Sequence, residues 1–103
     1  MSLDPYPTDE ELEKVSLWDY RLGFAPLLDY VKSLWWQADW GWSQRGNTYY
    51  VSTGGWSGNE SLIGALQANW RFWAACWVSS RRGGHYRFHN PKWAKPVKPK
   101  EER

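Results

Sequence analysis

Tryptophan is the residue that most constrains what this chain can fold into. Ten of its 103 residues are tryptophans, and eight of these lie between Trp35 and Trp77. Each indole buries roughly 150–250 Å², so a few of them are enough to make the core of a small domain. Ten indoles in so short a chain also leave some at the surface, where large aromatic side chains are typical anchors of binding surfaces.

The position of each indole predicts its place in the fold. Tryptophans on periodic apolar stretches are expected in the core, namely Trp18, Trp35, Trp70, Trp73 and Trp77. Tryptophans in a short hairpin, a glycine-rich loop and the C-terminal segment are not required to be buried, namely Trp40, Trp42, Trp56 and Trp93. A search for a binding face therefore begins with the second group.

The chain has the length of one domain and contains a single cysteine, Cys76. No intramolecular disulfide can form, so packing must hold the fold, as in a reducing cytosol. Apolar neighbours on both sides of Cys76 predict a buried, unreactive thiol. The acidic N-terminus lacks the apolar run of a signal peptide, and no stretch approaches the ~20 residues of a membrane span. We therefore expect a cytoplasmic protein with no membrane contact.

Charge is divided unevenly along the chain. Residues 1–39 carry three basic and eight acidic side chains, a balance of −5, whereas residues 40–103 carry ten basic and three acidic side chains, a balance of +7. This division predicts a polarised surface that attracts a partner of opposite charge. A second interpretation is that the acidic first helix packs against the basic half of the same molecule.

Two helices are predicted in the N-terminal third. Thr8 and Glu11 have the spacing of a capping box, and an apolar stripe continues this helix to a stop at Gly23. A second helix is expected to begin at Pro26, a favourable first helical position, and to end near residue 36 or 37.

A β-hairpin is predicted next. Trp40–Trp42 and Thr48–Ser52 have the residue types of strands, and Gln44–Asn47 between them is a set of turn-forming residues. Side chains alternate along a strand, so Trp40 and Trp42 should share one face.

A third helix and a second hairpin complete the pattern. Ser57 and Glu60 have the spacing of another capping box, which predicts a helix through about residue 70. Helical spacing continues to Trp77, but the aromatic run from Arg71 favours a strand, and we expect a strand there. The turn Arg81–Gly84 and a return strand over 85–89 then close the hairpin.

These elements predict an α+β fold of two N-terminal helices, a β-hairpin, a helix and a second β-hairpin. The hairpins are expected to form a four-stranded antiparallel sheet with the helices on one face. Residues 8–89 should form a single domain, with a flexible lead at 1–7 and a basic, disordered tail rich in proline and lysine at 90–103.

Two glycine-containing turns are the candidate binding positions. The loop at 53–58 lies between a strand and a helix, where phosphate cradles occur, but it lacks the Lys-Ser/Thr ending of a P-loop, and Glu60 would repel phosphate. The turn Arg81–Gly84 offers two guanidinium groups, accessible backbone N–H groups and the nearby imidazole of His85. We expect the two turns to lie near each other. The predicted binding residues are Trp56, Ser57, Asn59, Ser80, Arg81, Arg82, His85 and Tyr86.

No set of residues predicts catalysis, a metal site or a cofactor. Ser57 lacks the first glycine of a nucleophile elbow, and no pair of carboxylates is placed for acid–base chemistry. A zinc site from Cys76, His85 and His89 is disfavoured, because the two histidines lie roughly 13 Å apart on an extended strand and a fourth ligand is missing. We therefore expect a protein that is not an enzyme. A small enzyme centred on the glycine loop and His85 is kept as a third interpretation, after protein binding and nucleic-acid binding.

Two stretches resemble a known group of proteins. The segments TGGWSGNE at 53–60 and SSRRGGHY at 79–86, with Trp40-Gly41-Trp42 upstream, are similar to small uncharacterised proteins of tailed bacteriophages and prophages. The resemblance covers about residues 26–89 and leaves out the basic tail. It brings no assigned activity, and it implies a phage-encoded protein that acts in the cytoplasm of a bacterial host.

We therefore expect a small accessory protein that binds a host or phage protein. One such role would be to inhibit a host defence, in the manner of anti-CRISPR proteins. The alternative is a small nucleic-acid- or nucleotide-binding protein that uses the hairpin Arg81–Tyr86 and the basic tail. Basic residues in this half interleave with aromatic residues that can stack on bases, namely Trp70, Phe72, Tyr86 and Phe88. The acidic N-terminal half and the lack of an RNP-like pattern weigh against the alternative.

Overall fold

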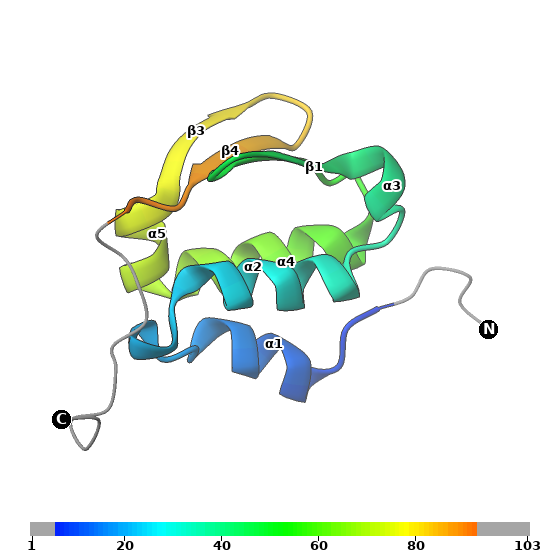
Figure 1. Cartoon of the computed structure of the whole chain (residues 1–103). Helices are drawn as coiled ribbons and strands as arrows, with labels where there is room; N and C mark the ends of the chain where they lie inside the picture. Colours follow the sequence, from blue (N-terminus) through cyan, green and yellow to red (C-terminus); the bar gives the residue numbers. More distant parts are fainter. Residues whose placement is uncertain (1–5, 93–103) are drawn as a thin grey trace, which may run out of the picture.

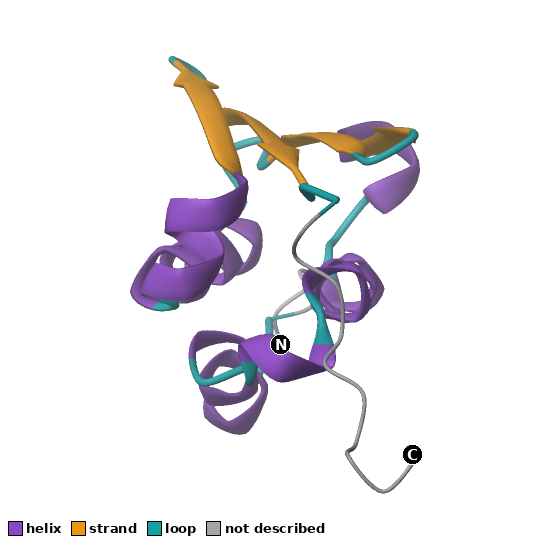
Figure 2. Ribbon diagram, turned by 60° about the vertical axis from the view of Figure 1, so that its left-hand side comes forward, coloured by secondary structure: helices purple, strands orange, loops and turns teal. Residues whose placement is uncertain are grey.

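The computed structural model describes residues 6–92, which fold into a curved four-stranded sheet lying over a set of helices (Figure 1). The elements are α1 (Asp9–Ser16), a 3-10 turn η1 (Tyr20–Leu22), α2 (Phe24–Leu34), α3 (Ala38–Gly41), β1 (Trp42–Arg45), β2 (Thr48–Ser52), α4 (Ser57–Ala68), α5 (Trp70–Cys76), β3 (Trp77–Arg81) and β4 (His85–His89). The strands pair antiparallel in the order β1-β2-β4-β3. The predicted α+β class is confirmed, with α1, α2, α4 and α5 on one side of the sheet (Figure 2). Most of the predicted lead and tail, including Trp93, lies outside the described residues.

The first helix begins where the sequence predicts and ends earlier. The Thr8 hydroxyl accepts a hydrogen bond from the Glu11 N–H (3.1 Å), and the Glu11 carboxylate accepts one from the Thr8 N–H (2.8 Å), so the capping box is present. The helix stops short because the Asn69 side chain donates to the carbonyls of Val15 (3.0 Å) and Trp18 (3.3 Å). The side-chain amide thereby supplies donors to carbonyls at the end of the helix, where the Val15 carbonyl also accepts from the Trp18 N–H (3.3 Å).

The segment between α2 and β1 corrects the prediction for two tryptophans. Gln37 adopts a left-handed conformation with φ 60°, and the residues after it form α3 and not a strand. Trp40 therefore stands on a short helix with 61% of its surface exposed, while Trp42 opens β1 and is 7% exposed. The predicted common face of these two residues is wrong. Gly41 is required between them because a Cβ atom there would lie 2.5 Å from the Ser52 carbonyl oxygen.

The fourth helix begins without the predicted capping box. Trp56 is its N-cap residue and makes no side-chain hydrogen bond, so Ser57 is already helical. The entry to α4 is held by the buried Asn59, whose side chain accepts from the Trp36 N–H (2.8 Å) and donates to the carbonyls of Trp36 (3.0 Å) and Thr53 (3.3 Å). Asn59 thus ties the segment after α2 to the loop after β2.

Residues 70–76 form a helix, α5, where the aromatic run predicts a strand. Asn69 explains the difference, because its side-chain oxygen accepts from the Phe72 N–H (3.2 Å) and starts a new helix directly after α4. The buried positions are Phe72 and Cys76, one helical turn apart, so the apolar face is offset from the predicted stripe. Trp70 and Trp77 are consequently 67% and 42% exposed, and their predicted burial is wrong.

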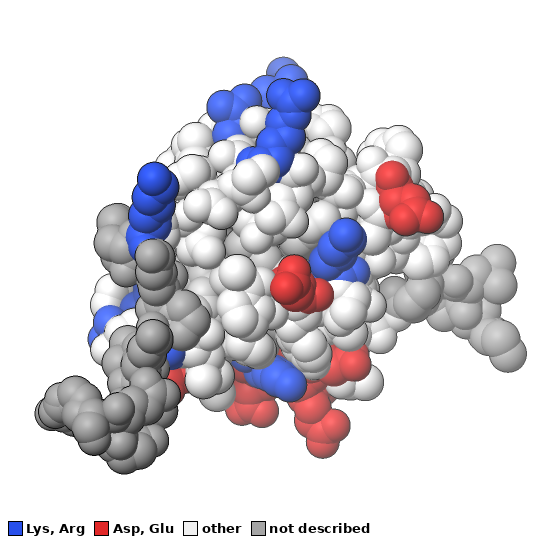
Figure 3. All heavy atoms as spheres, in the orientation of Figure 1, with Lys and Arg blue, Asp and Glu red and all other residues white. Residues whose placement is uncertain are grey.

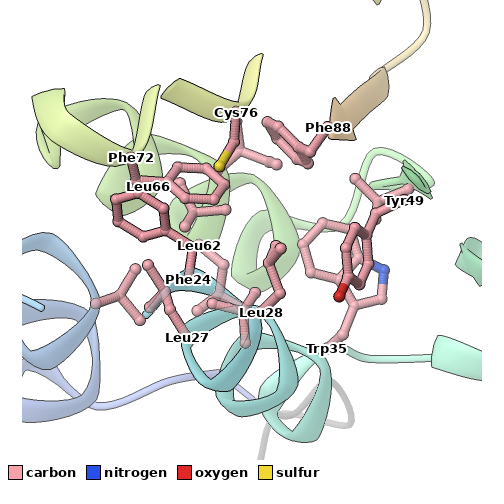
Figure 4. Close-up of a cluster of buried hydrophobic side chains, with 14 of the residues drawn as sticks. Phe24, Leu27, Leu28, Trp35, Tyr49, Leu62, Leu66, Phe72, Cys76 and Phe88 are labelled. Atoms are coloured by element: carbon pink, nitrogen blue, oxygen red, sulfur yellow. The ribbon is translucent and has the colours of Figure 1, made fainter. Parts of the chain in front are cut away.

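The core lies between the sheet and the helices (Figure 4). Its buried hydrophobic members are Val15, Phe24, Leu27, Leu28, Val31, Trp35, Trp42, Tyr49, Val51, Leu62, Ile63, Leu66, Phe72, Cys76 and Phe88. Figure 4 shows the Cys76 side chain between Phe72 and Phe88. Along β2, Tyr49 and Val51 are buried, so the alternate residues of that strand point to the opposite face of the sheet.

Candidate binding surface

The face of the sheet that points away from the helices, here called the outer face, carries polar side chains from all four strands. Directly opposed residues of antiparallel strands lie on the same face, so the pairing sets these side chains in rows. The rows are Ser43, Tyr50, Arg87 and Ser79; Ser52, His85 and Arg81; and Arg45, Thr48 and His89. The outer face therefore presents hydroxyl groups, imidazoles, guanidinium groups and one tyrosine ring.

The outer face is cationic. The four strands and the turns within the two hairpins contain Arg45, Arg81, Arg82 and Arg87 and no carboxylate. In Figure 3, basic side chains gather over the sheet and most acidic ones lie toward the opposite pole, where α1 lies. Acidic atoms also lie at the upper right, over α3, which carries Asp39. Within residues 6–92 the one salt bridge joins a different pair, Arg21 and Asp19, so the arginines of the sheet have no carboxylate partner there.

The acidic helix α1 does not neutralise the positive charge of the outer face. It packs against α4, a helix from the basic half of the chain, as the second interpretation of the charge division expects. However, α4 itself carries no basic residue. The two helices α2 and α4 lie between α1 and the sheet (Figure 1), so the charge division along the sequence becomes a division between two poles of the molecule.

A pocket of about 110 Å³ opens in the outer face between β2, β4 and β3. Its walls include Tyr50, Arg87 and Ser79 from one row and Ser52, His85 and Arg81 from the next. The Ser52 hydroxyl and the His85 Nδ1 lie 2.7 Å apart and share a hydrogen bond. The Arg87 guanidinium lies 5.3 Å from the centre of the Tyr50 ring, a cation–π contact. Both contacts join side chains of the neighbouring strands β2 and β4 at the pocket.

The glycine loop after β2 and the turn between β3 and β4 lie side by side, which confirms the prediction. The Thr53 N–H donates to the Gly84 carbonyl at 3.0 Å. Gly84 has a φ of 79°, and a Cβ atom there would run into the Thr53 hydroxyl, so this close approach requires glycine. The pocket lies at the same end of the sheet, because Ser52 precedes Thr53 and pairs with His85.

Three tryptophans next to this loop form a cluster, here called the tryptophan corner, made of Trp36, Trp40 and Trp56. The Trp56 ring packs at a steep angle against Trp36 and Trp40, with centroids 4.5 and 5.7 Å apart. It also covers Gly54, where a Cβ atom would lie 2.6 Å from the ring. Trp40 is the exposed member, and the other two are half-buried. The corner thus places an exposed indole next to the glycine loop, on the same short helix as Asp39.

The residues predicted for the site fall into four groups. Those that line the pocket are Arg81, His85 and Tyr86. Those exposed without lining it are Arg82, in the adjoining turn, and Ser80, which pairs with Tyr86 and so lies on the opposite face of the sheet. Those near the tryptophan corner are Trp56 and Ser57, the latter exposed at the start of α4. Asn59 is 1% exposed, and its side chain is engaged in hydrogen bonds within the fold, so we assign it to structure and not to binding.

Five residues that line the pocket are missing from the predicted set, namely Tyr50, Val51, Ser52, Ser79 and Arg87. Strand alternation alone places Tyr50 with Ser52 and Arg87 with His85 on common faces. The sequence does not show that β2 pairs with β4 as well as with β1, and this pairing brings the two sets of side chains together.

The aromatic residues predicted to stack on bases do not lie on the outer face. Phe72 and Phe88 are fully buried, and the Tyr86 ring stacks on Phe88 at the core side of the sheet. Trp70 is exposed on α5, away from the strands, with the Arg71 guanidinium 4.6 Å from its ring centre. The aromatic side chain that the pairing places on the outer face is Tyr50, which is 39% exposed.

The groups capable of covalent or metal chemistry are separated. Burial raises the pKa of Cys76 to about 12, so its thiol is protonated at neutral pH, and it lies in the core while both histidines lie on the outer face. No three His, Cys, Asp or Glu residues between 6 and 92 cluster as metal ligands. The Ser52–His85 contact has the length of a nucleophile–base pair, but no carboxylate of the described strands orients the imidazole.

Comparison of the chain with protein-family models, with curated proteins and with solved structures finds no match. None of the helices between residues 6 and 92 is long and apolar enough to cross a membrane.

Proposed function

We propose that this protein is a non-catalytic binding domain that docks its outer face and tryptophan corner onto an acidic surface of a partner protein. The observation that carries the proposal is the charge of the outer face, where strands and hairpin turns hold four arginines and no carboxylate. Carboxylates of a partner would supply the ion pairs that the arginines of the sheet lack within residues 6–92. Such complementarity also accelerates association.

The residue types on this surface support a protein interface. Hot spots of interfaces are enriched in tryptophan, tyrosine and arginine, and Trp40, Tyr50 and Arg87 are all exposed here. A guanidinium group binds a carboxylate through two parallel hydrogen bonds, which adds geometric selectivity. Side chains held on strands are already ordered, so less conformational freedom is lost on binding.

A nucleic acid is the second candidate, favoured by the same positive charge and by the Tyr50 ring. Sheets that bind single strands commonly stack two or three bases on exposed aromatic residues. The outer face offers one such ring, and the Arg87 guanidinium already lies over it at 5.3 Å. We therefore rank a protein partner ahead of a nucleic acid.

The resemblance to phage and prophage proteins extends the proposal to the setting of the interaction. It implies a host or phage protein in a bacterial cell as the partner. Blocking a host defence protein, in the manner of an anti-CRISPR protein, is one form that the proposal takes.

The test is a comparison of captured proteins. The full chain is immobilised and exposed to a bacterial cell extract, and bound proteins are quantified by mass spectrometry. Arg45→Gln/Arg87→Gln removes two charges from the outer face, and Lys14→Gln/Lys32→Gln removes two charges from the helical side as a matched control. We expect the wild type and the control to retain the same acidic proteins in equal amounts. The outer-face variant should retain about tenfold less of them, because this variant lacks charged interface contacts.

Two outcomes would overturn this function. Equal capture by the outer-face variant and the wild type would show that the outer face is not the docking surface, and a wild type that retains no protein would remove the proposed activity. Oligonucleotide binding at low salt that weakens steeply as salt rises, together with capture abolished by nuclease, would favour the second candidate.

A further inference from the structure

The pocket in the outer face has the size of a site for a small group. At about 110 Å³ it is well below the ~300–1,000 Å³ of pockets that enclose drug-sized ligands or cofactors. It opens between strands of the sheet and not between loops, so its walls are built on rigid elements. A group of a few atoms at the end of a larger ligand would fit such a pocket.

The chemistry of the walls selects an anion. Two guanidinium groups, from Arg81 on β3 and Arg87 on β4, line the pocket together with the hydroxyl groups of Ser52 on β2 and Ser79 on β3. No carboxylate is among the lining residues. The donors therefore come from three different strands and surround the opening.

Two side chains of the pocket already have a partner within the fold. The His85 imidazole is oriented by its 2.7 Å hydrogen bond with Ser52, and the Arg87 guanidinium is positioned over the Tyr50 ring. Fixed donors lose little freedom on binding, which favours recognition of one compact group.

We infer that this pocket binds a single phosphate group, held by Arg81 and Arg87 with Ser52, Ser79 and His85 as further hydrogen-bonding partners. A phosphate monoester carries close to two negative charges and three strongly accepting oxygens, which matches donors on three strands better than a two-oxygen carboxylate does. The inference rests on the proposed function only for the source of the phosphate, which a protein partner would present on a phosphorylated side chain.

The test is a titration of the isotopically labelled full chain with inorganic phosphate at constant ionic strength, followed by NMR of backbone amides and arginine side chains. We expect saturable shifts centred on residues 50–52, 79–81 and 85–87. Arg81→Gln and Arg87→Gln should each weaken phosphate binding about tenfold, the effect of losing a charged hydrogen bond. Arg45→Gln is the matched control, because Arg45 lies on the same face outside the pocket. It should change the affinity by about twofold or less, since salt screens charges at a distance.

Two results would overturn the inference. One result is a set of shifts that spreads over all arginines without saturating, or an Arg45→Gln variant that loses as much affinity as the pocket variants. Either would show that phosphate is attracted to the positive charge in general and has no specific site. Acetate that produces the same saturable shifts as phosphate at equal concentration would show that the pocket does not select phosphate.

Two further ligands identify the source of the phosphate and separate this inference from the proposed function. A phosphoserine peptide that binds more tightly than a nucleoside 5′-monophosphate would support both. Tighter binding of the nucleotide would support the phosphate site and contradict the protein partner. Phosphate binding by a chain that captures no protein would leave the site established and the proposed function rejected.

Discussion

Trp35 and Trp40 are close in the sequence and have opposite surroundings. Trp35 is 5% exposed, donates its indole N–H to the Ser52 carbonyl (3.2 Å) and packs against Trp42 with centroids 5.3 Å apart. Trp40 is exposed and has Trp56 as its aromatic neighbour. The abundance of tryptophan in this chain therefore supplies both a core and an exposed anchor.

Replacing these two residues should change stability unequally. Trp35→Ala removes a buried indole and leaves a cavity, which should cost about 3–5 kcal/mol of unfolding free energy. Trp40→Ala removes one aromatic contact and should cost about 1 kcal/mol. Urea unfolding of both variants measures the difference. If Trp40→Ala were as destabilised as Trp35→Ala, Trp40 would belong to the core and not to a binding surface.

Cys76 shows how burial controls a reactive group. Burial raises the pKa of its thiol from 9.0 to about 12, so the unfolded chain loses the thiol proton at a lower pH than the folded chain. The contribution to stability is fully present below about pH 9 and is lost as the pH rises toward 12. The same burial protects the thiol from reagents that attack the thiolate.

Comparing wild type with Cys76→Ala as a function of pH tests this account. The free energy of unfolding of the wild type should fall relative to the variant by on the order of 4 kcal/mol between pH 9 and 12. Other groups that titrate in this range are present in both chains and largely cancel in the difference. Tyr49 is the exception, because its pKa is raised by burial and also by the neighbouring Cys76, so the difference reports on the two groups together. A constant difference across this range would contradict the raised pKa.

At the scale of elements, Asn69 joins three helices. It is 5% exposed, caps the start of α5 through its side-chain oxygen and donates to carbonyls at the end of α1. Its own N–H bonds to carbonyls of the last turn of α4. The angle between α4 and α5, and with it the start of β3, depends on this residue.

Asn69→Ala should therefore destabilise the fold by about 2–4 kcal/mol, since it removes the cap of α5 and the side-chain donor to the Val15 and Trp18 carbonyls. Gln67→Ala, an exposed change on α4, is the control and should alter the unfolding free energy by about 0.5 kcal/mol or less. Chemical unfolding measures both. Equal stability of the two variants would mean that Asn69 does not join the helices.

Local signals in the sequence predict some elements and not others. The Thr8–Glu11 capping box and the two hairpin turns depend on neighbouring residues, so spacing alone identified them. The α5 helix depends on a cap whose side chain also reaches α1, a contact distant in sequence, and aromatic content pointed to a strand instead. The pocket depends on the pairing of β2 with β4, which no local pattern specifies.

At the scale of the whole molecule, the uneven charge of the sequence becomes two poles. The sheet forms a cationic pole, and the acidic α1 lies on the far side of α2 and α4 (Figures 1 and 3). An acidic partner approaching this molecule is attracted to the outer face and repelled from the opposite side, which orients it before contact. The tryptophan corner then offers apolar area at one end of the docking surface.

The central claim is that the outer face is the docking surface, and the capture comparison between its variant and the matched control tests it most directly. The account predicts that Arg45→Gln/Arg87→Gln loses the acidic proteins that wild type and Lys14→Gln/Lys32→Gln both retain from a bacterial extract. Retention of the same proteins by the outer-face variant, at the level of the wild type, would contradict it.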